Sequence, residues 1–197
     1  DLLITNAAFI NSTSDSIGQG GNVSLRGRNI EISNQSLIAS DADFIGNAGS
    51  IDIVASDRLD LDSVQILSKA DSGTGDGGTI RIEAGRLFMT DASVSSDSES
   101  FGRAGTVQVR AGQMILDGND REFTGISSDA FFDGDAGSVT IDAGSLVLRN
   151  GAYVSSSAGL AGGSGRAGSV VVRTADLTLV RGGYITTIGI QTDGGDI

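Results

Sequence analysis

The sequence predicts an all-β fold, a right-handed parallel β-helix of about seven rungs with three short strands in each rung. Three observations lead to this fold class. A glycine-anchored phrase recurs along the chain, short segments between the anchors alternate apolar with polar residues, and no stretch keeps a helical 3.6-residue period over three turns. Each repeat is therefore expected to form one rung of a stack.

The recurring phrase sets the length of the repeat. GRAGSVVV at residues 165–172 nearly copies GRAGTVQV at 102–109, and GDAGSVTI stands between them at 134–141. Aligning each glycine that precedes a polar residue and then Ile or Val gives anchors 27 to 32 residues apart, a period typical of repeat architectures. The anchors are Gly21, Gly49, Gly78, Gly105, Gly137, Gly168 and Gly195.

Each repeat contains three segments of period two, separated by small residues or by Asn-Gly. In the repeat that begins at Gly137, Val139 and Ile141 mark the first segment, Leu146 and Leu148 the second, and Val154 the third. Such a rung buries its apolar face only when the next rung stacks on it, about 4.8 Å away. Parallel crossovers favour right-handed winding. Residues 1–197 are thus expected to be one β-helix segment, a slice of a longer shaft.

The alignment also predicts which side chains point inward. The first-strand column is Val23/Leu25, Ile51/Ile53, Ile80/Ile82, Val107/Val109, Val139/Ile141 and Val170/Val172. The second-strand column is Leu2/Ile4, Ile30/Ile32, Leu59/Leu61, Leu87/Met89, Met114/Leu116, Leu146/Leu148 and Leu177/Leu179. The third-strand column is Ile10, Ile38, Ile66, Val94, Ile126, Val154 and Ile185.

A hydroxyl follows the third-strand apolar position by two residues in every repeat. The set is Ser12, Ser40, Ser68, Ser96, Ser128, Ser156 and Thr187. A catalytic serine needs a base, and the chain has no histidine. The repetition indicates a stacked structural column that satisfies polar groups where the coil turns into its loop.

Composition narrows the range of functions. The chain has 13 Lys and Arg against 25 Asp and Glu, a net charge of −12, so nucleic acid and anionic membrane surfaces are poor partners. It has no Cys and no His, which excludes disulfides, thiolate metal sites and imidazole catalysis. No apolar run approaches the roughly 18 residues of a membrane helix, so no membrane insertion is expected.

Charges alternate at the position that follows the first-strand core pair. From Glu83 onward, successive repeats carry Glu83, Arg110, Asp142 and Arg173. Stacked in register, these side chains are neighbours on one outer face, where opposite charges favour the correct register.

The phrases GNAGSIDIVA at 46–55 and DAGSLVLRNGAYVSSS at 142–157, with the recurring GxAG[ST]V, resemble the repeat region of filamentous-haemagglutinin-like exoproteins, closest to large surface proteins of cyanobacteria and related bacteria. The resemblance implies a β-helical shaft, export by two-partner secretion through an outer-membrane pore, and a secreted or cell-surface location. It further implies an adhesive or coat role toward host or neighbouring-cell surfaces, glycans or other shafts. The secretion-domain motifs of that family are not found in this sequence.

An alternative function is that of a β-helical enzyme acting on polysaccharides. Glu31 and Asp60 occupy adjacent rungs of the outward second-strand column, with Asp62 two residues further on. Their carboxyl groups are expected roughly 5 Å apart, near the spacing of a retaining glycosidase pair. The competing interpretation is a solvated surface whose charges are offset by Arg58 and Arg86. We expect the second, and therefore no enzyme.

Calcium is a further alternative, although no cofactor is required by the pattern. Asp71 and Asp76, and Asp133 and Asp135, stand among glycines, as do the acidic residues of 117–120. Calcium prefers such oxygen ligands, but neither the EF-hand order nor the nine-residue calcium repeat is present. Only weak binding is expected.

The candidate binding surface is an apolar stripe on the outward second-strand column. Phe88, Ile115 and Val147 occupy three consecutive rungs, which makes a stripe about 10 Å long. Phe101, Phe131, Phe132 and Leu160 recur at the variable-loop edge of the same rungs. Either the loops cover this stripe, or the stripe contacts a neighbouring shaft, another domain or the apolar face of a sugar.

Overall fold

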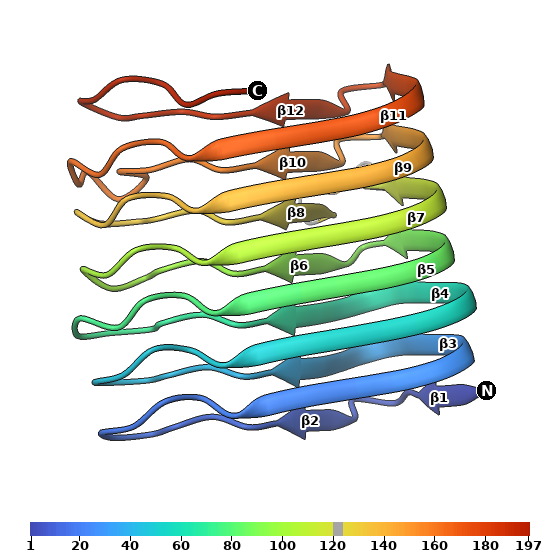
Figure 1. Cartoon of the computed structure of the whole chain (residues 1–197), viewed down its shortest axis with the longest axis horizontal. Coiled ribbons are helices and arrows are strands. Elements are labelled where there is room, and N and C mark those ends of the chain that lie inside the picture. Colours follow the sequence, from blue (N-terminus) through green and yellow to red (C-terminus); the bar gives the residue numbers. More distant parts are fainter. Residues whose placement is uncertain (120–123) are drawn as a thin grey trace.

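A computed structural model describes residues 1–119 and 124–197 of the chain. These residues wind into an all-β parallel solenoid of about six turns, and they contain no helix. Figure 1 shows the coils stacked from the N-terminal to the C-terminal rung in a right-handed sense, with the loops gathered along one edge. The predicted fold class is confirmed.

The described residues contribute twelve strands to one parallel sheet, in which each strand pairs with its equivalents in the rungs above and below. The strands are β1 (Leu2–Ile4), β2 (Phe9–Asn11), β3 (Asn22–Ala39), β4 (Ser50–Leu67), β5 (Thr79–Thr90), β6 (Ser93–Ser95), β7 (Thr106–Asp117), β8 (Gly125–Ser127), β9 (Ser138–Arg149), β10 (Tyr153–Ser155), β11 (Ser169–Val180) and β12 (Tyr184–Thr186).

The first and second segments of a rung form one continuous strand in β5, β7, β9 and β11. In β3 and β4 the third segment is joined to them as well. The ladder between β5 and β7 continues through the pair Ala84 and Ala111 at the first corner. A small side chain at this corner leaves room for the chain to bend while it stays extended. The backbone therefore keeps its ladder of hydrogen bonds around the bend, which the alternation pattern alone did not predict.

The second corner uses left-handed backbone. Every rung has at least one non-glycine residue with a positive φ here, and the first of these residues in each rung are Asn6, Asn34, Ser63, Asp91, Asn119, Asn150 and Arg181. Five of these seven residues are Asn or Asp, the non-glycine types that tolerate this conformation best.

The predicted register is confirmed along the solenoid. Val107 pairs with Val139, and Leu116 pairs with Leu148. In the central rungs the side chains predicted to point inward are buried, whereas the alternate positions Thr140 and Val147 are only half-buried. Toward the two ends, several inward residues are only partly buried: Leu2, Ile10, Leu25, Val172 and Ile185. In the last rung, Leu177 and Leu179 are 48% and 43% exposed, because no described rung stacks on them.

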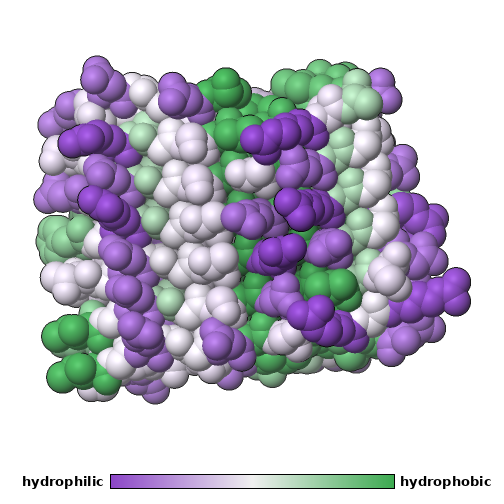
Figure 2. Space-filling model, viewed as in Figure 1, coloured by the Kyte–Doolittle hydropathy of each residue, from purple (hydrophilic) through white to green (hydrophobic). Residues whose placement is uncertain are grey.

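The alternating charges lie on one outer face, as predicted. Glu83 pairs in register with Arg110, and Arg110 with Asp142. The Asp142 carboxylate lies 3.6 Å from Arg110 Nε and 3.3 Å from Arg173 Nη1. Figure 2 shows hydrophilic side chains gathered in bands that run along the solenoid axis across this face. Each exposed pair contributes only about 0.2–1 kcal/mol, so the column favours the register more than it adds stability.

Candidate functional site

The loops of successive rungs are stacked and hydrogen-bonded to one another. A column of parallel bridges joins Ser14, Ala42, Ala70, Ser98, Ala130, Ala158 and Gly189. Further backbone bonds follow at the loop starts, such as Glu99 N to Ala70 O at 2.8 Å. The loop edge is therefore a continuous surface with a fixed geometry, able to present side chains from several rungs to one ligand.

The predicted hydroxyl column has the structural role expected of it. Ser68 Oγ donates to Gly49 O at 2.8 Å, and Ser96 Oγ donates to Gly78 O at 2.7 Å. Ser128 Oγ makes the same bond to the Gly105 carbonyl at 2.7 Å. These hydroxyls are fully buried. Each one ties the end of the third strand to the glycine anchor at the start of its own rung.

A second polar column, one residue further along, was missed by the sequence analysis. Asp97 Oδ1 accepts a hydrogen bond from Asp129 N at 2.8 Å, and Asp129 Oδ1 accepts one from Ser157 N at 2.6 Å. Asp41 Oδ1 accepts a bond from Lys69 N at 2.9 Å in the same way. The carboxylates thus satisfy backbone amides of the next rung. The sequence feature that could have identified this column is an acidic residue at the same repeat position in three rungs.

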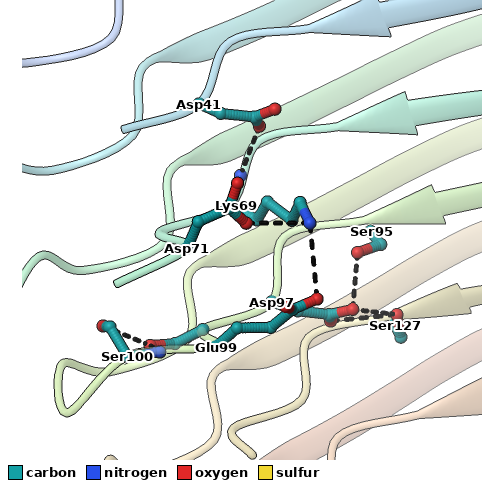
Figure 3. Close-up of polar contacts among 9 residues, drawn as sticks. Asp41, Lys69, Asp71, Ser95, Asp97, Glu99, Ser100 and Ser127 are labelled. Carbon is teal, nitrogen blue, oxygen red and sulfur yellow. Dashed lines mark hydrogen bonds and ion pairs between the residues drawn. The ribbon is translucent and has the colours of Figure 1, made fainter. Parts of the chain in front are cut away.

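Burial perturbs these carboxyl groups. Burial, followed by the charge of Asp97, raises the pKa of Asp129 to about 7. Burial also raises the pKa of Asp97, against hydrogen bonds from the Asp129 amide and from Ser95 and Ser127, which lower it. The two carboxyl groups lie on adjacent rungs and do not ionise independently. Figure 3 shows Asp97 between Ser95 and Ser127.

The pair predicts a pH dependence of stability. Because the folded-state pKa of Asp129 exceeds its unfolded value of 3.8, the folded state binds more protons between these values. The stability that Asp129 contributes to the folded state is fully present below about pH 4 and is lost as the pH rises through about 7. The melting temperature is therefore expected to be higher at pH 5 than at pH 8.

Asp129→Asn keeps the acceptor for Ser157 N and removes the charge. It should raise the melting temperature at pH 8 and weaken the pH dependence between 5 and 8. Asp142→Asn, at a partly exposed position on the outer face, serves as the control. If Asp129→Asn shows the parent's pH profile, the buried pair does not govern stability in this range.

Lys69 connects the loop starts of two rungs. Its Nζ lies 2.8 Å from Asp71 Oδ1 and 3.3 Å from Glu99 Oε1, as Figure 3 shows. Burial alone would lower the pKa of Lys69, but the two carboxylates raise it overall. Lys69 therefore remains charged and holds Asp71 and Glu99 in place.

Beside these carboxylates lies a hollow of about 600 Å³ at the loop edge. Residues from four successive loops line it: Asp71, Ser72, Gly73, Glu99, Ser100, Phe101, Phe131, Phe132 and Ala161. The ring centroids of Phe101 and Phe132 are 6.0 Å apart, and the two residues are 64% and 41% exposed. The hollow combines exposed apolar surface with two carboxylates. This combination is typical of a binding surface rather than of side chains that stabilise the fold.

The predicted stripe exists in register. Phe88 pairs with Ile115, and Ile115 pairs with Val147. All three residues are half-buried, and the Arg58 guanidinium lies 4.8 Å from the centre of the Phe88 ring. The loops lie at the edge of the coil opposite to the second segments of β5, β7 and β9, which carry the stripe (Figure 1). The neighbours of the stripe are therefore strands rather than loops. Its role as a contact surface stays a prediction.

The carboxylates of the enzyme alternative are neighbours, as expected. Glu31 pairs in register with Asp60. Asp60 Oδ2 accepts a hydrogen bond from Arg58 Nε at 2.6 Å, and Asp62 Oδ1 accepts one from Ser63 Oγ at 3.2 Å. Arg58 thus offsets the charge of Asp60, as the competing interpretation predicts, whereas Arg86 pairs with Asp57 instead. Catalysis at this pair stays a prediction.

The acidic residues considered for calcium bind loop groups instead. Asp76 Oδ1 accepts from Arg103 N at 2.8 Å, and Asp135 Oδ1 accepts from Arg166 N at 3.0 Å. Asp133 Oδ1 accepts from Ser164 N at 3.0 Å, and Asp71 pairs with Lys69. Within residues 1–119 and 124–197, no three acidic side chains converge as a metal site requires; residue 120 lies outside these ranges.

Comparisons of the chain with protein-family models, with curated proteins and with solved structures gave no significant match. The described part of the chain has no helix long and apolar enough to cross a membrane.

Proposed function

We propose that this chain is part of the structural and adhesive shaft of a secreted or cell-surface bacterial exoprotein. The observation that carries the proposal is the continuous stacking of the described rungs, in which the strands pair in register with their equivalents and a column of bridges joins the loops. Such a stack has a fixed length per rung of about 4.8 Å and places equivalent outward residues of successive rungs side by side on its surface. This construction suits a rigid spacer with lateral contact surfaces.

The route and location follow from the sequence resemblance to filamentous-haemagglutinin-like exoproteins. Two-partner secretion passes an unfolded chain through an outer-membrane pore. The absence of cysteine removes disulfides that would block such a passage. Rungs that pair chiefly with their sequence neighbours can then form one after another outside the cell.

Lateral adhesion is assigned to the stripe of Phe88, Ile115 and Val147. Half-buried apolar residues on three adjacent rungs form one surface that a flat partner can cover. Another shaft, a cell surface or the apolar face of a glycan is a suitable partner, because contact needs no catalytic group.

Replacing Phe88, Ile115 and Val147 together by Thr should weaken self-association and surface attachment and leave the β-sheet circular dichroism unchanged. Sedimentation velocity and a cell-binding assay measure the two effects. The matched control is Val54→Thr with Val171→Thr, two half-buried outward valines on the first strand. If the triple variant assembles and adheres like the parent, the stripe is not the adhesive surface.

A further inference from the structure

The loop-edge hollow has properties that the adhesive stripe lacks. Its walls come from the loops that follow β4, β6, β8 and β10, so it extends over about three rung spacings, roughly 14 Å. Phe101 and Phe132 stand at the surface, and backbone pairing between the loops holds their positions. Backbone hydrogen bonds between the loops fix the walls of the hollow, so binding requires little ordering of the chain.

Its polar groups are mostly committed to the fold. Ser72 Oγ donates to Asp43 O, and Ser100 Oγ donates to Gly75 O at 2.7 Å. Ser100 Oγ also accepts from Gly102 N at 3.0 Å. A sugar is recognised through several directed hydrogen bonds to its hydroxyls, and the two hydroxyls lining this hollow already have partners. The faces of the phenylalanine rings remain available.

The charge of the hollow is negative. Asp71 and Glu99 line it, none of the lining residues is cationic, and Lys69 beside them offsets only one of the two charges (Figure 3). Asp43 in the adjacent loop adds a third carboxylate. Burial raises the pKa of Asp43 most, and the charges of Asp71 and Asp15 raise it further. Phenylalanine faces and carboxylates both attract cations.

We propose that this hollow binds the cationic side chain of an arginine or lysine carried by a basic segment of a partner protein. The alkyl stem packs on Phe101 and Phe132, and the charged head lies between a ring face and the carboxylates of Asp71 and Glu99. The elongated shape of the hollow allows the segment to run along the loop edge. This surface is separate from the Phe88 stripe, and its test is independent of the proposed adhesive function.

The test compares two small probes of equal shape, Nα-acetyl-arginine amide and Nα-acetyl-citrulline amide. Citrulline keeps the length and planarity of arginine and lacks its charge. Titrations are followed through the ring signals of ¹³C-labelled phenylalanine. Arginine is expected to shift the Phe101 and Phe132 signals with a millimolar dissociation constant, and citrulline to bind about tenfold more weakly. Added salt should weaken arginine binding.

Variants locate the site. Phe101→Ala and Glu99→Gln should each reduce arginine binding about three- to tenfold. Phe9→Ala removes a phenylalanine that is 70% exposed on β2 and should leave binding unchanged. Because Phe101 and Glu99 are both exposed, the variants are expected to fold, which circular dichroism verifies.

Four results overturn the proposal. Equal binding of arginine and citrulline shows that charge is not recognised. Tighter binding of choline than of arginine points to a lipid headgroup, and binding of a neutral oligosaccharide through Phe101 points to a glycan. No shift of the Phe101 or Phe132 signals with any probe shows that the hollow is not a binding site.

Discussion

Gly105→Ala is expected to destabilise the solenoid by about 4 kcal/mol or more, at the upper end of single-residue effects. A Cβ atom at Gly105 would lie 1.9 Å from Gly78 O and 2.3 Å from Ser96 Oγ. Gly78 O accepts hydrogen bonds from Thr106 N at 2.9 Å and from Ser96 Oγ at 2.7 Å. The methyl group can be accommodated only if adjacent rungs separate and these bonds break.

Urea unfolding followed by circular dichroism measures the loss. Gly27→Ala is the matched control, because Gly27 pairs in register with Ala55, and the corner column carries alanine in the following rungs. A Cβ atom there meets nothing closer than Ile30 Cγ1 at 3.1 Å, the movable part of a side chain. Comparable stability of Gly105→Ala and the parent would mean that the rungs are not packed as closely as described.

The positions of the glycine anchors could be predicted from the sequence, but the structural reason that glycine is required there could not. Recurrence of a glycine at each repeat start marked the period, and alternation within the repeat marked the inward residues such as Val139 and Leu148. At the five anchors from Gly49 to Gly168, a serine hydroxyl and the carbonyl of the preceding anchor occupy the space of a side chain, and only the three-dimensional structure reveals this. The hydroxyl column itself was predicted, because its repetition argued for structure rather than catalysis.

The candidate site was predicted less well for a physical reason. Repeats reveal what every rung shares, whereas a hollow depends on where rungs differ. Phe101, Phe131 and Phe132 belong to loops of different lengths, so the alignment could place them only near one edge. Their convergence with Asp71 and Glu99 follows from how each loop turns.

The second large effect is expected at Leu148. Its side chain is fully buried between rungs, so Leu148→Ala should cost about 2–5 kcal/mol through lost burial and the cavity left behind. Its neighbour Val147 points to the other face and is half-buried, so Val147→Ala should cost less than about 1 kcal/mol. A one-residue change of register would exchange the two positions.

The difference in unfolding free energy between Leu148→Ala and Val147→Ala therefore tests most directly the claim that all rungs stack in one register and form a shaft. Both proteins are unfolded in urea under the same conditions and compared with the parent. The account predicts that Leu148→Ala is the less stable variant by at least about 1 kcal/mol, the gap between the lower limit of the buried-leucine range and the upper limit for a half-exposed strand residue. Equal losses, or a larger loss in Val147→Ala, would contradict it.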